Sequence, residues 1–179
     1  MNILLNDNKI DFSLNDLPML ISGAEKTGTS FFTVCLLANL LQNGHKVILF
    51  SAHAAAKEEF RNQVGANLNN ALIIDSENED EFIEILKNIK DLSDRVILIK
   101  NIDSYSQKLF NFVKDFRLVI FSGDLDKCAF ADELLKNKFN TKIFFSYSEK
   151  YALKEPKSLP KYSGMIISGH HNGLIRLDI

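Results

Sequence analysis

The sequence predicts an α/β fold in which a mainly parallel β-sheet is flanked by helices. Short apolar runs alternate with helix-forming segments from residue 18 to about residue 145. Strands interleaved with helices form βαβ units, so we expect a parallel sheet that is covered on both faces. A glycine-containing loop joins the first apolar run to a long apolar helix. Two further apolar runs around GHHNG (169–173) predict a C-terminal β-hairpin.

Each predicted element has its own local signal. Core strands are expected at the apolar runs 19–22, 46–50, 71–74, 96–99, 118–121 and 142–145. Helices are expected at about 30–42, 54–63, 106–115 and 130–137, and in an amphipathic segment that starts with the acidic run 77–81. Asn43-Gly44 provides a stop signal for the first of these helices.

The chain of 179 residues is expected to form one domain. Its predicted parts are an N-terminal hairpin at 1–16, a core at 17–146, a linker rich in Pro and Lys at 147–161 and the C-terminal hairpin at 162–179. The composition is 46% apolar and 25% charged, which is typical of a globular protein and argues against disorder.

Charge and cysteine content exclude some classes of protein. The 21 basic and 23 acidic residues give a net charge of -2, so charge does not indicate a nucleic-acid partner, although a few local lysines could meet a phosphate backbone. The two cysteines, Cys35 and Cys128, have neither disulfide-framework nor metal-ligand spacing. The start, MNILLNDNKI, lacks signal-peptide features, and no apolar run reaches about 18 residues. We therefore expect a cytoplasmic protein without a membrane span.

The loop after the first strand matches most of a phosphate-binding pattern. The pattern is GxxxxGK(S/T) between a strand and a helix, and its glycines let backbone N–H groups converge on an anion at the helix N-terminus. Here the loop is built from Gly23, Ala24, Glu25, Lys26, Thr27, Gly28, Thr29 and Ser30. These eight residues are the predicted nucleotide-binding loop.

The lysine of that pattern is replaced by Thr29. The lysine normally spans the β- and γ-phosphates, and a threonine supplies no charge. Lys26, earlier in the loop, could turn inward as a displaced phosphate lysine, or it could point into solvent. Both interpretations stay open at this stage.

A second departure follows the predicted strand 96–99. In P-loop proteins an acidic residue at this position (Walker B) holds magnesium, whereas here the position is Lys100 and the next acid is Asp103. A cation at that point repels Mg²⁺, so the sequence predicts no metal site there and leaves magnesium uncertain. Lys100 could instead reach the space that the missing loop lysine leaves, by bonding to loop carbonyls, to the hydroxyls of Thr29 or Ser30, or to a bound anion.

With these motifs in view, the chain resembles the RecA-like P-loop ATPases, and among them the KaiC, RadA and DnaB group. The resemblance covers about residues 17–146 and rests on GAEKTGTS, the helix that follows, GHKVILFSAH, ALIID and RVILIKNID. It implies a three-layer RecA-like P-loop NTPase fold with ATP as the bound nucleotide. We also expect a protein partner or a homo-oligomer.

Active members of that group place a glutamate just after the second strand, where it polarises the attacking water. Here His53 follows the strand, and the nearest acids, Glu58 and Glu59, lie inside a predicted helix. Positioned charge carries most of phosphoryl transfer. The sequence therefore favours a pseudo-ATPase with slow or no hydrolysis that serves as a regulatory or assembly module. The alternative is a working ATPase with a rearranged phosphate site that uses Lys26 and Asp103, related to motors or DNA processing.

The predicted C-terminal hairpin contains two adjacent histidines, a residue type that can ligate a metal. His170 and His171 lie in a predicted tight turn, and no third ligand stands near them in the sequence. A surface turn is therefore the preferred interpretation of this pair.

Overall fold

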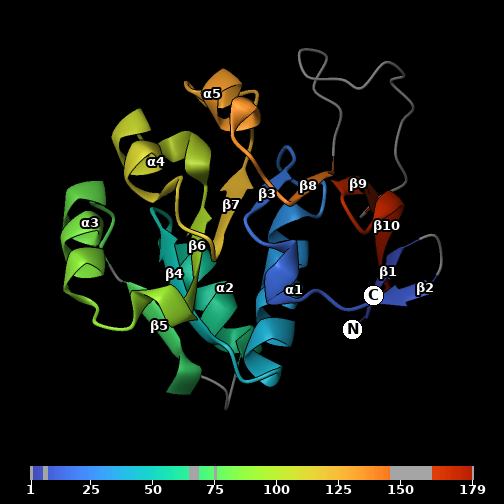
Figure 1. Cartoon of the computed structure of the whole chain (residues 1–179), viewed down its shortest axis with the longest axis horizontal. Coiled ribbons are helices and arrows are strands. Elements are labelled where there is room, and N and C mark those ends of the chain that lie inside the picture. Colours follow the sequence, from blue (N-terminus) through green and yellow to red (C-terminus); the bar gives the residue numbers. More distant parts are fainter. Residues whose placement is uncertain (1, 6–7, 65–68, 75, 146–162, 179) are drawn as a thin grey trace.

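The computed structural model describes residues 2–5, 8–64, 69–74, 76–145 and 163–178. Within these residues ten strands form one sheet, in the order β2-β1-β10-β9-β8-β3-β7-β6-β4-β5 (Figure 1). The strands are β1 (Asn2–Leu5), β2 (Asn8–Ile10), β3 (Met19–Ser22), β4 (Lys46–Ser51), β5 (Ala71–Ile74), β6 (Arg95–Lys100), β7 (Val119–Gly123), β8 (Thr141–Phe144), β9 (Ser163–Ser168) and β10 (Asn172–Asp178). The linker predicted at 147–161 lies outside the described residues.

The six strands predicted for the core all occur and pair in parallel, from β8 through β3, β7, β6 and β4 to β5. The helices between them are α1 (Thr29–Gln42), α2 (Ala54–Val64), α3 (Glu79–Asn88), α4 (Gln107–Val113) and α5 (Ala131–Lys136). Short 3-10 turns add η1 (Leu14–Asp16), η3 (Leu92–Asp94) and η4 (Ile102–Ser104). The predicted α/β class, with a mainly parallel sheet flanked by helices, is confirmed.

Alternation along the strands creates two apolar cores, one on each face of the sheet. On β3, Met19 and Ile21 pack with residues of α1 and with Phe60 of α2. Leu20, between them, packs into the other core with residues of α3, α4 and α5. Successive side chains of a strand point to opposite faces, so one strand serves both layers. The result is three layers, with helices on both sides of the sheet.

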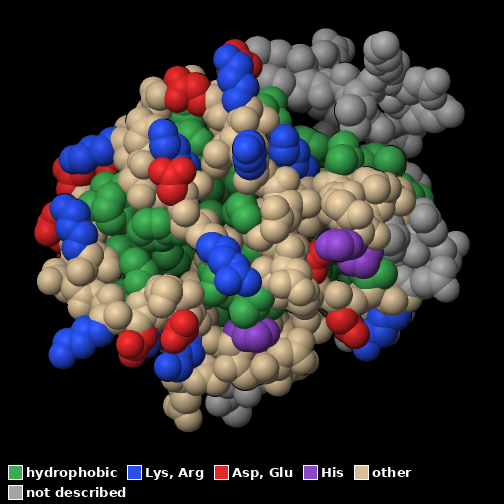
Figure 2. Space-filling view, in the orientation of Figure 1, with side chains coloured by type: hydrophobic (Ala, Val, Ile, Leu, Met, Phe, Trp, Pro, Cys, Tyr) green, Lys and Arg blue, Asp and Glu red, His purple; other side chains and the backbone are tan. Residues whose placement is uncertain are grey.

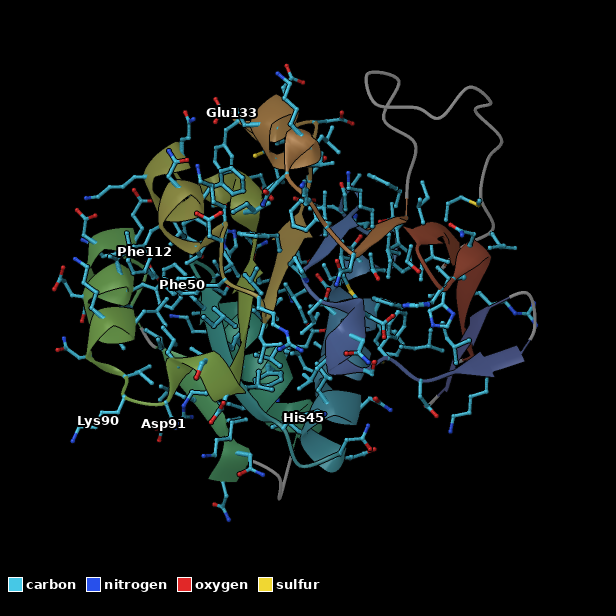
Figure 3. The ribbon with its side chains drawn as sticks, in the orientation of Figure 1. His45, Phe50, Lys90, Asp91, Phe112 and Glu133 are labelled. Carbon is cyan, nitrogen blue, oxygen red and sulfur yellow. The ribbon has the colours of Figure 1, made fainter. Side chains whose placement is uncertain are left out.

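Aromatic stacking fixes the core on the side of α3. Phe50 of β4 stacks on Phe82 of α3, with ring centroids 3.9 Å apart, and on Tyr105, 5.0 Å away. Figure 3 shows Phe50 in the interior, between the strands and the helices at that edge. Tyr105 directly follows η4, so this packing also fixes the segment that leaves the end of β6.

The two terminal hairpins extend the same sheet. β9 pairs antiparallel with β8 and with β10, and β1 pairs antiparallel with β10 and with β2. Figure 1 shows these four strands together on the right, away from α3 and α4. The N-terminal hairpin is therefore joined to the C-terminal one through the pairing of β1 with β10. This pairing connects residues at opposite ends of the chain.

The surface shows no dominant charge on the face in view. Among the described side chains in Figure 2, lysines and arginines are interspersed with aspartates and glutamates. In the described part of the chain, no helix has the length and apolarity needed to cross a membrane. The two cysteines are both free thiols, and burial raises the pKa of Cys35 to about 11.

Candidate nucleotide-binding site

The loop between β3 and α1 follows the path that its glycines allow. Gly28 immediately precedes α1 with φ 107°, in the left-handed region that favours glycine. Lys26 also has a positive φ, 67°, which is uncommon for a residue with a Cβ atom. These two residues turn the chain sharply between the end of β3 and the first turn of α1.

Position 23 requires a glycine, because neighbouring atoms leave no room for a Cβ atom. A Cβ atom at this position would lie 2.2 Å from Thr29 Oγ1 and 2.8 Å from Phe145 Cβ. The loop therefore folds back so tightly that its first residue touches the start of α1. The backbone N–H of Gly23 donates to the carbonyl of Gly123 on the adjoining strand β7, at 3.2 Å, which holds the loop against the sheet.

The N-terminus of α1 differs from those of α3 and α4, although α5 also begins without a side-chain cap. Asn78 caps α3 and Ser106 caps α4, each accepting hydrogen bonds from backbone N–H groups of the first turn. Among the described residues no side chain caps α1 in this way. The first N–H groups of a helix have no intrahelical acceptor, and they carry the positive end of its dipole. An anion bound in the loop would satisfy them.

A cavity of about 480 Å³ opens at this end of the sheet, beside the loop. All the predicted site residues except Thr27 line it: Gly23, Ala24, Glu25, Lys26, Gly28, Thr29, Ser30, Lys100 and Asp103. The Thr27 hydroxyl instead donates to the carbonyl of Ala24 at 2.7 Å and closes the loop on itself. The chain thus brings the loop and the end of β6 together around one space.

Thr29, at the position of the usual lysine, is buried and held within the loop. Its hydroxyl lies 3.1 Å from the hydroxyl of Thr27, and its carbonyl accepts a hydrogen bond from Thr33 at 2.7 Å. Thr33 in turn lies 3.1 Å from Ser122 Oγ on β7. Thr29 therefore stabilises the loop and leaves the cavity without the charge that a lysine would bring.

Lys26 remains exposed at the mouth of the cavity. Within the part of the chain that the structure describes, its ammonium forms neither a salt bridge nor a hydrogen bond. The other two lysines of the cavity are both in ion pairs. Lys127 lies 3.7 Å from Glu25 and from Asp124, and Lys100 pairs with a glutamate of α2. Lys26 is thus the lysine of this cavity that has no ion-pair partner among the described residues.

Lys100 has a different partner from the one that the sequence suggested. The sequence predicts bonds to loop carbonyls, to the hydroxyls of Thr29 or Ser30, or to a bound anion, whereas in the structure the ammonium lies 3.5 Å from Glu59 Oε2. Lys100 is only 5% exposed, because β6 extends one residue beyond the predicted strand and carries it into the sheet. Burial lowers the pKa of Lys100, and the nearby Glu59 carboxylate partly offsets that effect.

Sequence reasoning missed Glu59. It assigned this residue to a helix, which is correct, and for that reason did not consider it as part of the site. In the structure α2 lies against α1 and β4, and the Glu59 carboxylate reaches the cavity with 38% of its side chain exposed. The signal available in the sequence was a lysine at a buried position, since a buried ammonium needs an anionic partner.

Asp103 lines the cavity, but its carboxylate already accepts a hydrogen bond from the protein backbone. Its Oδ1 accepts a hydrogen bond from the backbone N–H of Asp124 at 2.9 Å. A Cβ atom at Gly123 would lie 2.4 Å from the same oxygen, so the carboxylate packs directly on the end of β7. The chain reaches this point through Asn101, whose left-handed φ of 62° turns it out of β6. Asp103 thereby ties the end of β6 to the loop after β7.

His53 follows β4, at the position where the resemblance to RecA-like ATPases implies a glutamate. Its backbone N–H donates to Ser51 Oγ at 3.1 Å, and Ser51 Oγ donates to Asn101 Oδ1 at 3.0 Å. The His53 ring lies 3.4 Å from Ser104 Oγ. These bonds join the ends of β4 and β6 and present an imidazole, in place of a carboxylate, to the cavity.

The terminal histidines lie in a turn, as expected. Ser168 Oγ accepts hydrogen bonds from the backbone N–H groups of His170 and His171, at 3.2 and 2.7 Å. His171 Nε2 lies 3.9 Å from Asp16 Oδ1. No group of three His, Cys, Asp or Glu side chains within the described ranges could hold a metal ion.

Comparison with known proteins gives matches in structure alone. No family model matches the chain, and no curated protein matches it in sequence. The conjugation coupling protein TcpA of pCW3, solved as a monomer with ATPγS, superposes with a TM-score of 0.63 at 12% identity. That match covers 98% of this chain and 65% of TcpA, so the chain spans less than two thirds of the coupling-protein structure.

Two other solved structures share the same architecture. The genome packaging NTPase B204 from Sulfolobus turreted icosahedral virus 2, in complex with AMPPCP, superposes with a TM-score of 0.65 at 15% identity, covering 94% of this chain and 100% of B204. The cytoplasmic domain of EssC superposes with a TM-score of 0.57 at 15% identity, covering 98% of this chain and 42% of that one. Identities this low show the fold alone: the chain has the P-loop NTPase fold.

Proposed function

We propose that this chain is a RecA-like pseudo-ATPase. In this proposal it binds ATP in the cavity beside the 23–30 loop, hydrolyses it slowly or not at all, and acts in the cytoplasm as a regulatory or assembly module. The observation that carries the proposal is a phosphate loop with an uncapped helix N-terminus, facing a cavity in which Lys100 and His53 stand where catalytic carboxylates are expected.

Binding is supported by the geometry of the loop. Gly23 and Gly28 give the close approach and the positive φ that bring backbone N–H groups toward one point. Lys26 is available at the mouth of the same cavity. Solved structures of the same fold contain ATPγS, AMPPCP and AMP, which supports a nucleotide as the ligand here.

Weak catalysis is supported by the charges of the cavity. Phosphoryl transfer depends on positioned charges that neutralise the phosphates and orient the attacking water. At the three positions where the fold normally supplies them, this chain has Thr29, Lys100 and His53. A bound ATP would therefore be held without the groups that activate water.

The partner is proposed from the functions of the structural neighbours. Solved structures with this fold include a conjugation coupling protein and a genome packaging NTPase. We place this chain in a comparable apparatus for DNA transfer or packaging, as a homo-oligomer or bound to an active ATPase. Its net charge of -2 favours contacts with protein over direct contacts with nucleic acid.

A working ATPase is the second candidate, and the free ammonium of Lys26 is the observation that favours it. Lys26 would bind the phosphates, and Asp103 would bind the metal ion. However, Asp103 Oδ1 already accepts the Asp124 N–H and packs on Gly123, which leaves one carboxylate oxygen for other ligands. We therefore prefer the pseudo-ATPase.

Calorimetric titration of the intact chain tests binding. ATP should bind at least about tenfold more tightly than adenosine, because the phosphates gain the loop N–H groups, and tenfold corresponds to about 1.4 kcal/mol. Gly23→Ala should remove this advantage, since its methyl group would overlap Thr29 Oγ1. Gly169→Ala is the matched control, because a Cβ atom there meets nothing within 4 Å. Equal affinities for ATP and adenosine in the parent chain would contradict the proposal.

A further inference from the structure

The residues of this cavity do not fit a magnesium ion. Other P-loop sites hold Mg²⁺ with an acid at the end of the strand equivalent to β6. Here that residue is Lys100, whose ammonium lies in the cavity wall and is 5% exposed. Asp103 Oδ1 is already bonded to the Asp124 N–H. A fixed ammonium next to a divalent cation is repulsive, so the cavity disfavours the metal.

The same ammonium can replace the charge that the metal would bring. Lys100 and the start of α1 line one cavity, so the positive charge faces the space where the loop would hold phosphates. An ammonium has three N–H donors, and Glu59 is the partner that the structure gives it among the described residues. Their separation of 3.5 Å is longer than the roughly 2.7–2.9 Å of a strong charge-assisted bond. Lys100 therefore retains capacity for an anion.

Glu59 is suited to hold Lys100 in place without neutralising the site completely. Its carboxylate is more exposed than the ammonium, at 38% against 6% of the side chain. Water therefore screens the carboxylate more than the buried cation. Because Glu59 also faces the cavity, its negative charge opposes the approach of a phosphate. Glu59 would thus position Lys100 and at the same time weaken anion binding.

We infer that this site binds a nucleoside triphosphate without magnesium, with the Lys100 ammonium supplying the positive charge that a metal ion supplies in other P-loop sites. Glu59 is a positioning residue for that ammonium. The inference rests on the proposed nucleotide binding and adds its metal independence. It also explains why the change from acid to lysine on β6 accompanies the loss of the loop lysine at Thr29.

The test is a titration of the intact chain with a fluorescent ATP analogue, in excess EDTA and in excess Mg²⁺. We expect the affinity in EDTA to equal or exceed that in Mg²⁺. Binding that requires Mg²⁺ would overturn this inference and leave the proposed nucleotide binding intact. The absence of binding under both conditions would overturn both proposals. These outcomes need no variant, so folding defects do not affect them.

Variants of the chain then test whether Lys100 is the group that supplies the positive charge. Lys100→Met should weaken binding in EDTA by about 10- to 100-fold, the range of a lost hydrogen bond to a charged group. Lys100→Arg should restore part of the affinity, and Glu59→Gln should strengthen binding by about threefold, consistent with a partly exposed charge. Lys57→Met is the matched control. Lys57 is a buried lysine of α2, 3% exposed, whose ammonium donates to the Ser76 carbonyl. Equal losses in Lys57→Met and Lys100→Met, measured on chains with unchanged thermal unfolding, would overturn the assignment.

Discussion

The Lys100 ammonium lies 3.5 Å from the Glu59 carboxylate, and this pair joins the end of β6 to α2 beside the cavity that both residues line. The pair is asymmetric, because the lysine is buried and the glutamate is partly exposed. A buried ion pair of this kind contributes little net stability, since desolvation offsets much of the Coulomb attraction. Its significance therefore lies in where it fixes a positive charge.

The first prediction concerns how the free energy of unfolding depends on pH. Burial lowers the folded-state pKa of Lys100 below its usual 10.5. Below the lowered pKa, Lys100 is charged in both the folded and the unfolded chain. Burying that charge on folding lowers the free energy of unfolding. Between the lowered pKa and 10.5 the unfolded chain binds more protons, so the free energy of unfolding contributed by Lys100 rises with pH. Lys100→Met should lack this rise.

Urea unfolding of parent and Lys100→Met chains, at neutral pH and at about pH 10, measures the difference. The parent should gain stability relative to the variant as the pH rises. The comparison cancels the contributions that the two chains share. Parallel pH profiles would show that Lys100 is not held as the structure indicates.

The second prediction concerns the two departures in the phosphate site. Lys100→Asp should lower the free energy of unfolding by about 2–4 kcal/mol, because a buried carboxylate would then face Glu59 without a cation. Adding Thr29→Lys should recover much of this loss by returning a positive charge to the loop. The double variant should also bind nucleotide in a magnesium-dependent manner. Chemical unfolding and titration in EDTA measure the two effects, and a double variant as unstable as Lys100→Asp would contradict the predicted coupling.

The third prediction concerns Lys26. Lys26→Ala should weaken ATP binding severalfold and leave adenosine binding unchanged, because the proposed contact of this lysine is with the phosphates alone. Lys108→Ala is a suitable control, since Lys108 is an exposed lysine of α4 that pairs with Asp80 away from the cavity. Calorimetry on both variants measures the effect. Equal ATP affinities for Lys26→Ala and the parent chain would show that Lys26 points into solvent and does not contact the phosphates.

The fourth prediction separates the pseudo-ATPase from a working ATPase. If Asp103 ties β6 to β7, Asp103→Asn should preserve stability and nucleotide affinity, because an amide oxygen still accepts the Asp124 N–H. Asp103→Ala should lower the free energy of unfolding by about 1–2 kcal/mol, as for a lost hydrogen bond in a buried setting. Thermal unfolding and binding in Mg²⁺ measure both effects. Loss of magnesium-dependent binding in Asp103→Asn would favour the working ATPase.

The sequence was sufficient for the parallel core and the loop, because their signals are local. Each strand of the core is a short apolar run, and the Gly23 and Gly28 spacing places the turn before α1. Two features of the fold depended on distant contacts that local patterns do not report. One is the pairing of β1 with β10, between opposite ends of the chain. The other is the position of α2, which brings Glu59 to Lys100.

The central claim is that the chain binds ATP and hydrolyses it slowly or not at all. The most direct measurement is to incubate the protein with ATP and Mg²⁺, remove the free nucleotide, and identify the bound nucleotide as a function of time. ATP should be recovered unchanged or converted to ADP only slowly. Recovery of ADP, with a turnover on the order of 1 per second as in ordinary enzymes, would contradict it.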